Sequence, residues 1–288
     1  MTTQALSIAL PASYRSADVL AFHARDAEGL AEQVGGAHIR KGVLLGGLPV
    51  LLDVELRPES AQCRIEADGE LDASTLALAH EALRSILALR IDPAPFTDFV
   101  REDAVFGPLV ARQPGLRIVQ SASVFEALTW AIIGQQINLP FAISLRRTFI
   151  QQAGCAHSSG LWCYPEALDV ARLDLEALTS RKFSRAKAET LLRVARMVAE
   201  GELCLAQDDD PARAAPLLLA IKGIGPWTVN YTLLRGYGYA DCSLEGDVAI
   251  RSALGKLLGE AGKPEQGQTA TWLAQYAPHL HWTGGTCA

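Results

Sequence analysis

The chain lacks the features of a membrane or secreted protein. No apolar run approaches the roughly 20 residues of a membrane span, and residues 1–4 carry no basic segment ahead of an apolar one. The cysteines show no paired CxxC spacing of the kind that binds zinc, and their spread indicates reduced thiols; they are Cys63, Cys155, Cys163, Cys204, Cys242 and Cys287. We therefore expect a cytoplasmic protein with no membrane association.

An excess of basic charge is also missing. The net charge of −6 argues against extended nonspecific DNA binding, although it leaves room for a local basic face. Basic residues do gather in one region and at one further pair of positions: Arg181, Lys182, Arg185, Lys187, Arg193 and Arg196, with Arg146 and Arg147. A solvated helix face is the alternative interpretation for most of them.

What the chain has is enough apolar residues for large cores. At 288 residues and 49% hydrophobic, it should divide into two or three units. Residues 43–56 and 63–67 run or alternate apolar between Gly and Pro, as strands do, and residues 72–89 have helical spacing. From Phe96 onward one helical pattern follows another. We predict an α+β fold in which a small antiparallel sheet, covered on one face by residues 72–89, precedes an all-helical region.

A short Gly-Ile-Gly turn, residues 223–225, separates two apolar helical stretches. Because glycine has no Cβ, a phosphate can approach the peptide N–H groups at the start of the second helix. Pro226 suits the first turn of that helix, where its missing N–H costs nothing. We also expect Gly225 to need a backbone conformation that other residues avoid. A plain helix cap is the alternative for this turn.

Two aromatic residues and a carboxylate follow the turn. Trp227 and Tyr231 are four positions apart, so they share a helix face and could wall a slot for a flat ring. Asp247 stands at an expected helix start. Taken singly, the aromatic pair could be core and Asp247 an N-cap. Their conjunction with the glycine turn favours a functional site.

These residues resemble a known family. Gly223, Gly225, Trp227 and Asp247 match, in order and spacing, the helix-hairpin-helix-Gly/Pro-Asp superfamily of DNA base-excision glycosylases. Residues 125–138 look like the F-E-x-L-x-x-x-I-x-x-Q-Q helix of that superfamily, and residues 180–189 are similar to its G-x-S-x-x-K-A stretch. The best fit within it is the 3-methyladenine DNA glycosylase II branch. Residues 10–25 resemble the opening segment of that branch.

The resemblance implies a domain organisation. Residues 1–99 would form an N-terminal α/β domain, and residues 124–239 a helical lobe containing the hairpin. Residues 100–123 and 240–288 would form a second helical lobe that carries the catalytic Asp. The active cleft would lie between the two lobes of this helix-hairpin-helix glycosylase core.

The resemblance also implies a chemistry. Asp247 would stabilise the sugar cation that forms as the N-glycosidic bond breaks. Trp227, Tyr231 and Phe22 would wall the base pocket, where aromatic faces attract a cationic alkylated purine. Relatives that cut the strand have Lys at the position of Trp227, so this chain should be monofunctional. The expected DNA contacts are Gly223, Ile224, Gly225, Gln135, Gln136, Ile137 and Lys222, with a solvated side chain as the alternative for Lys222.

Cofactor and partner expectations follow from the same resemblance. The main-chain carbonyls of Leu219, Ile221 and Gly223 would hold a monovalent cation at the hairpin. No cofactor should be required, and no iron–sulfur cluster is expected because its four clustered cysteines are absent. The partner would be double-stranded DNA containing alkylated bases, bound by a monomer at the bacterial nucleoid.

The chain departs from the family pattern in three places. Glu245 replaces the usual Pro two residues before Asp247, and Gln136, beside Ile137, occupies the position of a bulky minor-groove wedge. Relatives have a further pocket Trp near the C-terminus. Either Trp282 takes its place in this chain, or the pocket is more open. His279 and His281 nearby are interpreted as a tail pair without a third metal ligand.

A second class of function competes with the enzyme. The chain could be a noncatalytic helix-hairpin-helix protein that binds damaged DNA and has lost turnover. The presence of Asp247 together with both pocket aromatics, Trp227 and Tyr231, favours the enzyme. The sequence does not rank 3-methyladenine, 7-methylguanine, hypoxanthine and ethenoadenine as substrates.

Overall fold

The structure is a computed structural model, and it describes residues 1–277. Trp282, His279, His281 and Cys287 lie outside the described residues. The cysteines within the described part are all free thiols. Among residues 1–277, no helix is both long and apolar enough to cross a bilayer.

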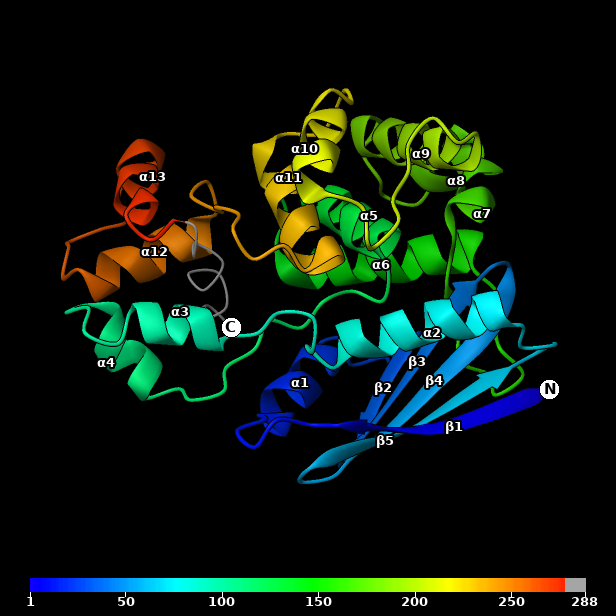
Figure 1. The fold of residues 1–288 in the computed structure, drawn as a ribbon. Helices are drawn as coiled ribbons and strands as arrows, with labels where there is room; N and C mark the ends of the chain where they lie inside the picture. The colour runs from blue at the N-terminus through cyan, green and yellow to red at the C-terminus, as the bar shows by residue number, and fades with distance from the viewer. Residues whose placement is uncertain (278–288) are drawn as a thin grey trace.

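The N-terminal part is an antiparallel sheet whose strands lie in the order β1-β5-β4-β3-β2 (Figure 1). Their bounds are Thr2–Ala9 (β1), Glu32–Gly35 (β2), His38–Leu45 (β3), Leu48–Leu56 (β4) and Ser60–Ala67 (β5). The predicted strands are confirmed as β3, β4 and β5. β1 carried no clear signal because it is an edge strand, of which Leu6 and Ile8 alone are partly buried.

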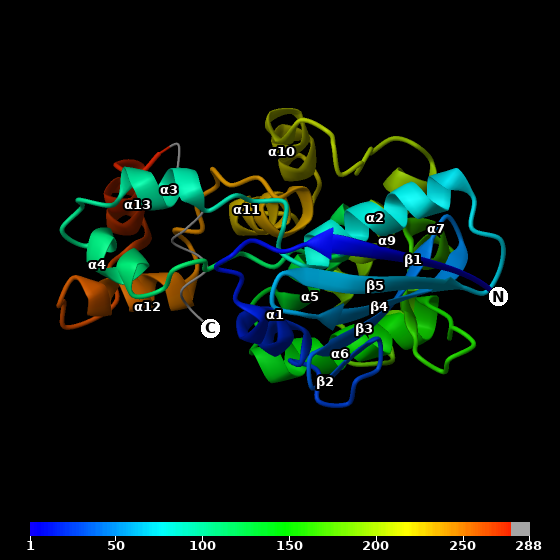
Figure 2. The same cartoon turned by 60° about the horizontal axis from the view of Figure 1, so that its bottom comes forward.

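One helix covers a face of this sheet, as predicted. α2 (Ala73–Ile86) begins after Asp72, whose carboxylate accepts the Thr75 N–H at 2.7 Å. Figure 2 shows α2 lying across the sheet. Leu83 and Ile86 are fully buried in the apolar cluster that α2 forms with the sheet. A short helix, α1 (Ser16–His23), lies near the end of the sheet.

The sheet receives one more strand from far along the chain. β6 (Cys163–Tyr164) pairs in parallel with β3, so that Gly42 lies opposite Cys163. A Cβ at Gly42 would stand 2.2 Å from the carbonyl oxygen of Trp162, which explains the glycine. This pairing attaches the helical region to the sheet.

The larger helical core packs behind the sheet, around α5. Its buried centre includes Leu128, Ile132, Phe149 and Leu191. The helices are α5 (Val124–Gly134), α6 (Leu139–Ala153), α7 (Ala167–Ala171), α8 (Leu175–Thr179), α9 (Arg185–Ala199), α10 (Pro211–Leu219) and α11 (Pro226–Thr232), which continues as a π-helical turn, η1 (Leu233–Tyr237).

A second group of helices forms a separate apolar cluster, at the left of Figure 1. Phe106 is its centre, with ring centroids 4.7 Å from Tyr276 and 5.4 Å from Trp272. The helices of this cluster are α3 (Ala94–Phe99), α4 (Phe106–Ala111) and α13 (Gln266–Ala274). α12 (Val248–Leu257) contacts α13 and places Ile250 in the larger core. The predicted fold class, a small antiparallel sheet followed by a two-part helical core, is confirmed.

A buried ionic network joins the sheet to the larger helical core. Glu126 on α5 accepts hydrogen bonds at 2.8 Å from Lys41 Nζ on β3 and from Arg146 on α6. Both cations also contact Glu32 on β2, and Arg146 does so at 2.9 Å. Burial alone would raise the pKa of Glu126, but the charges of Lys41 and Arg146 hold it below its ordinary value. The two glutamates and two cations therefore balance one another inside the fold.

Candidate DNA-binding and catalytic cleft

An open cleft of about 870 Å³ lies between the larger helical core and the α12–α13 group. Three segments line it: the loop at residues 134–138, the hairpin at residues 223–228, and residues 243–248. Asn230 on α11 donates to the carbonyl of Ser243 at 2.5 Å, which ties the second and third segments together. The fold thus brings the hairpin motif, with Asp247, and the end of the motif at residues 125–138 to one opening.

The two hairpin glycines serve different purposes. Gly223 has φ +99°, and a Cβ there would stand 2.1 Å from Thr190 Oγ1 on α9. Gly225 is the N-cap of α11 with φ −109°, and a Cβ there would meet nothing within 4 Å. The expectation of an unusual conformation at Gly225 is therefore wrong: this backbone angle is open to any residue, and the unusual one belongs to Gly223.

Asp247 is fixed at the edge of the cleft. It is the N-cap of α12, and its Oδ1 accepts the N–H groups of Ala249 at 2.8 Å and Ile250 at 3.2 Å. Its Oδ2 accepts the indole Nε1–H of Trp227 at 2.9 Å. The carboxylate is thus held in one orientation by three donors, two of them at a helix N-terminus, where negative charge is stabilised.

Trp227 and Tyr231 form one aromatic wall. Their ring centroids are 5.2 Å apart and their planes are tilted by 32°. Since the rings touch each other, a base cannot insert between them and would have to lie against an outer face. Trp227 lines the open cleft, and Tyr231 continues the wall into a neighbouring recess.

The structure places Phe22 in that recess, away from Asp247. The recess measures about 30 Å³ and is lined by Phe22, Arg25, Trp130 and Tyr231, among others. The guanidinium carbon of Arg25 lies 3.6 Å from the centre of the Phe22 ring. The face that Phe22 was expected to offer to a base is thus occupied by Arg25, which the sequence interpretation did not single out.

The three loop residues expected to contact DNA have different surroundings in the structure. Gln135 donates from Nε2 to the Gly223 carbonyl and to Thr228 Oγ1, both at 3.0 Å. Its side chain therefore braces the loop against the hairpin. Ile137 is half-buried against the helical core, whereas Gln136 is exposed and has φ +56°. Of the three, Gln136 is the residue that projects outward.

Two apolar residues beyond this loop were missed. Leu139 is 49% exposed and Phe141 is 36% exposed, both in the first turn of α6. Apolar side chains held in solvent beside a candidate minor-groove loop could enter a base step. The available signal was their position directly after Asn138, which caps α6 and accepts the Phe141 N–H at 3.0 Å.

Several of these basic residues hydrogen-bond to backbone carbonyls or form ion pairs within the protein. Lys187 donates to the Ile133 carbonyl at 2.8 Å, and burial lowers the pKa of its ammonium group. Arg193 donates to the Lys222 carbonyl at 2.9 Å, so it supports the hairpin. Arg146 belongs to the buried network, and Arg147 pairs with Asp26 at 2.8 Å. The expectation that Arg146 and Arg147 offer charge to DNA is therefore wrong.

The remaining hairpin residues are placed as follows. The side chain of Lys222 is exposed, whereas that of Ile224 is buried. The Ile221 carbonyl accepts the Ile224 N–H at 3.0 Å, and the Gly223 carbonyl accepts from Gln135. Each of these carbonyls has a second lone pair, so a cation could still be bound. No cluster of three or more metal-binding side chains occurs within residues 1–277.

Glu245, the departure beside Asp247, also lines the cleft. Its Oε2 and the hydroxyl of Ser243 are buried and have no hydrogen-bond partner within the protein. Buried polar atoms of this kind are costly unless water or a ligand satisfies them. The cleft therefore holds two unsatisfied polar groups next to Asp247.

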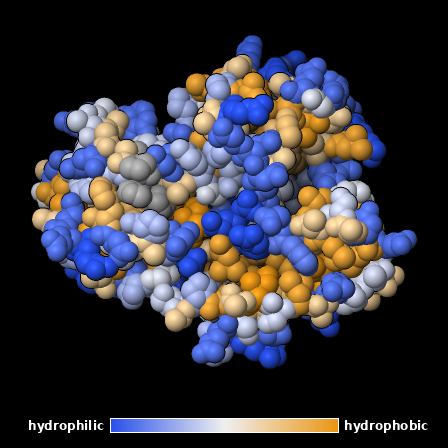
Figure 3. Space-filling view, in the orientation of Figure 1, coloured by the Kyte–Doolittle hydropathy of each residue, from blue (hydrophilic) through white to orange (hydrophobic). Residues whose placement is uncertain are grey.

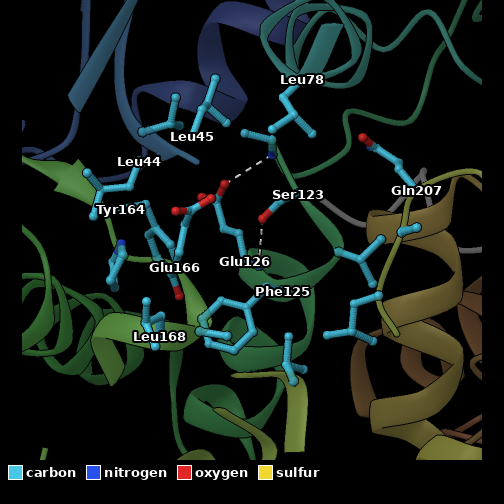
Figure 4. A pocket seen from close by; sticks show the side chains of 18 of the residues that line it. Leu44, Leu45, Leu78, Ser123, Phe125, Glu126, Tyr164, Glu166, Leu168 and Gln207 are labelled. Atoms are coloured by element: carbon cyan, nitrogen blue, oxygen red, sulfur yellow. Dashed lines mark hydrogen bonds between the residues drawn. The ribbon is translucent and has the colours of Figure 1, made fainter. Parts of the chain in front are cut away.

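A second cavity, of about 380 Å³, lies elsewhere and is mostly apolar (Figure 4). Leu45 from the sheet, Leu78 from α2 and Phe125 from α5 line it. Its carboxylates are already bonded, since Glu126 belongs to the ionic network and Glu166 accepts the Gly46 and Gly47 N–H groups. Apolar side chains also gather on the outer surface over α2 and the adjoining sheet (Figure 3). Because both carboxylates of this second cavity are bonded within the protein, the Asp247 cleft is the better candidate site.

Comparison with known proteins identifies the class. Residues 129–279 match the HhH-GPD superfamily of base excision DNA repair proteins, so the chain belongs to that family. It is 35% identical over 149 residues to a DNA-3-methyladenine glycosylase of Bacillus subtilis, covering 50% of the chain and 49% of the relative. It is 28% identical over 185 residues to DNA-3-methyladenine glycosylase 2 of Escherichia coli, covering 64% and 66%.

Among solved structures, a 3-methyladenine DNA glycosylase from Archaeoglobus fulgidus has the same fold. The TM-score is 0.79 at 21% identity, and the match covers 96% of this chain and 94% of the other. The sequence matches to the two 3-methyladenine DNA glycosylases bear out the resemblance to that branch, and the solved structure bears out the fold. The sequence matches span about half to two thirds of the curated relatives' own length.

Proposed function

We propose that the protein is a monofunctional DNA glycosylase that excises alkylated purines from double-stranded DNA and leaves an abasic site. The observation that carries the proposal is Asp247, a carboxylate held by two backbone N–H groups and the Trp227 indole at the edge of an open cleft. Family membership supports enzymatic base excision over a noncatalytic damage-binding protein.

The reaction needs a base outside the helix. A damaged base is rotated out of the stack at a cost of a few kcal/mol, and weak pairing of alkylated bases reduces this cost. The flipped base would lie against the exposed face of Trp227, with its sugar beside Asp247. As the N-glycosidic bond breaks, the electron pair leaves with the base, and the carboxylate stabilises the cationic sugar until water adds to it.

Strand cleavage is not part of the proposed reaction. β-Elimination proceeds through an imine between a protein amine and the sugar. The hairpin position beside Asp247 holds Trp227, whose indole nitrogen donates a hydrogen bond and is not a nucleophile. The product is thus an intact strand with one abasic site.

The hairpin and the loop after α5 would hold the DNA backbone and groove. The open space at Gly225 lets a phosphate reach the first N–H groups of α11, which have no partner within the helix. Gln136, Leu139 and Phe141 would enter the minor groove from the opposite side of the cleft. A monovalent cation on the carbonyls of Leu219, Ile221 and Gly223 would add positive charge near that phosphate. We propose a monomer acting in the cytoplasm on chromosomal DNA.

The test is base release from DNA. Wild-type protein should release alkylated purines from methylated duplex, and Asp247→Asn should abolish most of this release. Release by the variant at the wild-type rate contradicts the role of Asp247. Failure of the wild type to release any modified base, with abasic duplex still bound, would favour the noncatalytic alternative.

A further inference from the structure

The charged side chains of the Asp247 cleft all have the same sign. Among the described residues that line it, the charged ones are Glu245 and Asp247, and none is a lysine or an arginine. Basic side chains would be expected in a cleft that only had to hold the DNA backbone, because phosphates are anionic. The lining of this cleft is suited instead to a positively charged group.

Glu245 lies in a short turn ahead of α12. On one side of it, the Ser243 carbonyl accepts a hydrogen bond from Asn230 on α11 at 2.5 Å. On the other side, the Asp247 N–H donates to the Leu244 carbonyl at 2.8 Å. The backbone is therefore fixed on both sides of Glu245, and its side chain is half-buried at the cleft.

The Glu245 carboxylate has no partner in the described part of the chain. No ion pair or hydrogen bond links it to another residue of 1–277, and its Oε2 is buried. Asp247 differs, because three donors hold its two oxygens. A partly buried charge without a partner is costly in the free protein. That cost falls when a positive charge comes to lie beside it.

Trp227 places the expected base in the same cleft as Glu245. Its indole Nε1–H donates to Asp247 at 2.9 Å, and the same cleft is lined by Trp227 and Glu245. A base that lies against the open face of Trp227 is therefore exposed to the charge of Glu245. An aromatic face and an unpaired carboxylate both attract a cationic ring.

We propose that Glu245 is a specificity-determining residue, which raises the preference of this cleft for purines with a formal positive charge over neutral purines. The inference rests on the proposed glycosylase function and refines its substrate class. The Pro that is usual at this position in the resembled family carries no charge, so this contribution to specificity belongs to Glu245 of this chain.

The charge of the departing base accounts for the discrimination. When the bond from the sugar to 7-methylguanine breaks, the electron pair leaves with a cationic base, which becomes neutral. When the base is hypoxanthine, the same step produces an anion, which then takes a proton from solvent. Glu245 attracts the first base before the bond breaks and repels the anion formed from the second. In both cases water adds to the sugar cation and releases a proton to solvent, so that step does not distinguish the bases.

The experiment compares two bases in otherwise identical duplexes. Single-turnover rates of release are measured for 7-methylguanine and for hypoxanthine, and the ratio of the two rates is compared between variants. Glu245→Gln should lower this ratio by about threefold to tenfold, a range that allows for solvent screening in an open cleft. Any change in the repulsion of DNA phosphates affects both duplexes alike, so it cancels in the ratio.

Two variants serve as controls. Glu245→Asp keeps the charge and should stay close to the wild-type ratio. Glu59→Gln removes the same charge from an exposed position in the turn between β4 and β5, outside the cleft, and should leave the ratio unchanged. Glu245→Pro, which introduces the residue usual in the resembled family, should shift the ratio in the same direction as Glu245→Gln.

Three results would overturn the proposal. They are an unchanged ratio in Glu245→Gln, a shift of equal size in Glu245→Asp or Glu59→Gln, and a greater loss of hypoxanthine release than of 7-methylguanine release in Glu245→Gln. The last would mean that Glu245 supplies a proton to a neutral base. In each case base release by the wild type continues, and the proposed function stands. Absence of release of any modified purine by the wild type is a different result, because it removes the proposed function together with the inference.

Discussion

Two sites in this molecule use carboxylates in opposite ways. Glu126 is 4% exposed, and it accepts hydrogen bonds from Lys41, Arg146 and the Ala122 N–H. Asp247 is also held by three donors, but all of them are uncharged and it borders an open cleft. The first carboxylate is neutralised by fixed cations, whereas the second keeps its negative charge available.

This difference separates stability from chemistry. A carboxylate whose charge is balanced in the ground state has little left to offer a cation that forms during a reaction. One that is oriented by dipoles and not neutralised can stabilise such a cation without reorganising. We therefore expect substitutions at Glu126 to affect folding, and substitutions at Asp247 to affect turnover.

The largest expected effect is at Glu126. Glu126→Gln leaves Lys41 and Arg146 with one buried carboxylate fewer, and breaking a buried pair in this way costs about 3–5 kcal/mol. Chemical denaturation should show that decrease in the free energy of unfolding, with little change in the rate of base release by the protein that remains folded. If Glu126→Gln lost turnover without losing stability, the proposed division between a stabilising carboxylate and a catalytic carboxylate would be contradicted.

The same network predicts how stability depends on pH. Burial opposes ionisation of Glu32 and Glu126, but Lys41 and Arg146 outweigh it, so the pKa of each glutamate lies below the ordinary 4.5. The stabilisation is therefore complete above that value and is lost as pH falls through the lowered pKa values. Denaturation midpoints measured below pH 4.5 should fall more steeply in wild type than in Glu126→Gln. Parallel curves would contradict this.

Asp247→Asn should have the next largest effect. Removing the charge should slow base release by about 10²–10³-fold, as for other preorganised electrostatic groups. Asn can still cap α12 through its side-chain oxygen, so the thermal midpoint and the affinity for abasic duplex should change little. Fluorescence anisotropy and thermal denaturation supply these controls. Weakened DNA binding equal to the loss of rate would assign Asp247 to binding instead.

The hairpin glycines should respond differently from each other. Gly223→Ala places a methyl group against Thr190 at positive φ, so the fold should lose about 1–3 kcal/mol. Gly225→Asp fits the backbone but puts a negative charge where a phosphate would approach, so abasic-duplex affinity should fall about tenfold with stability kept. Gly225→Ala is the matched control. Unchanged affinity in a folded Gly225→Asp protein would reduce the hairpin to a helix cap.

The smallest expected effect is an absence of reaction. Borohydride added during turnover should trap no covalent protein–DNA adduct, because Trp227 provides no amine. The abasic strand should remain intact until alkali is added. A trapped adduct would show that a lysine in this chain acts as a nucleophile, and that the site carries out more than base release.

The sequence predicted the elements whose signals are local. β3 to β5 follow from apolar runs between Gly and Pro, and α2 from its helical spacing behind Asp72. Trp227 and Asp247 were identified as a pair because the family motif places them in order. The motif named Gln135 but gave no sign that its amide bonds the hairpin, because a motif does not say which atoms a side chain will contact. β6 has two paired residues, too few for a period to be seen.

The sequence by itself determined β3, β4, β5, α2 and the hairpin turn, because each depends on neighbours a few positions away. The tertiary structure alone decided that Arg25 covers Phe22 and that Arg146 is buried with Glu126. It also decided that Asp247 accepts a hydrogen bond from Trp227. Lys41 and Glu126 are 85 positions apart, and such contacts form only when the folded chain brings their elements together. No periodicity in the sequence encodes that distance, because charge pairing depends on spatial proximity and not on spacing along the chain.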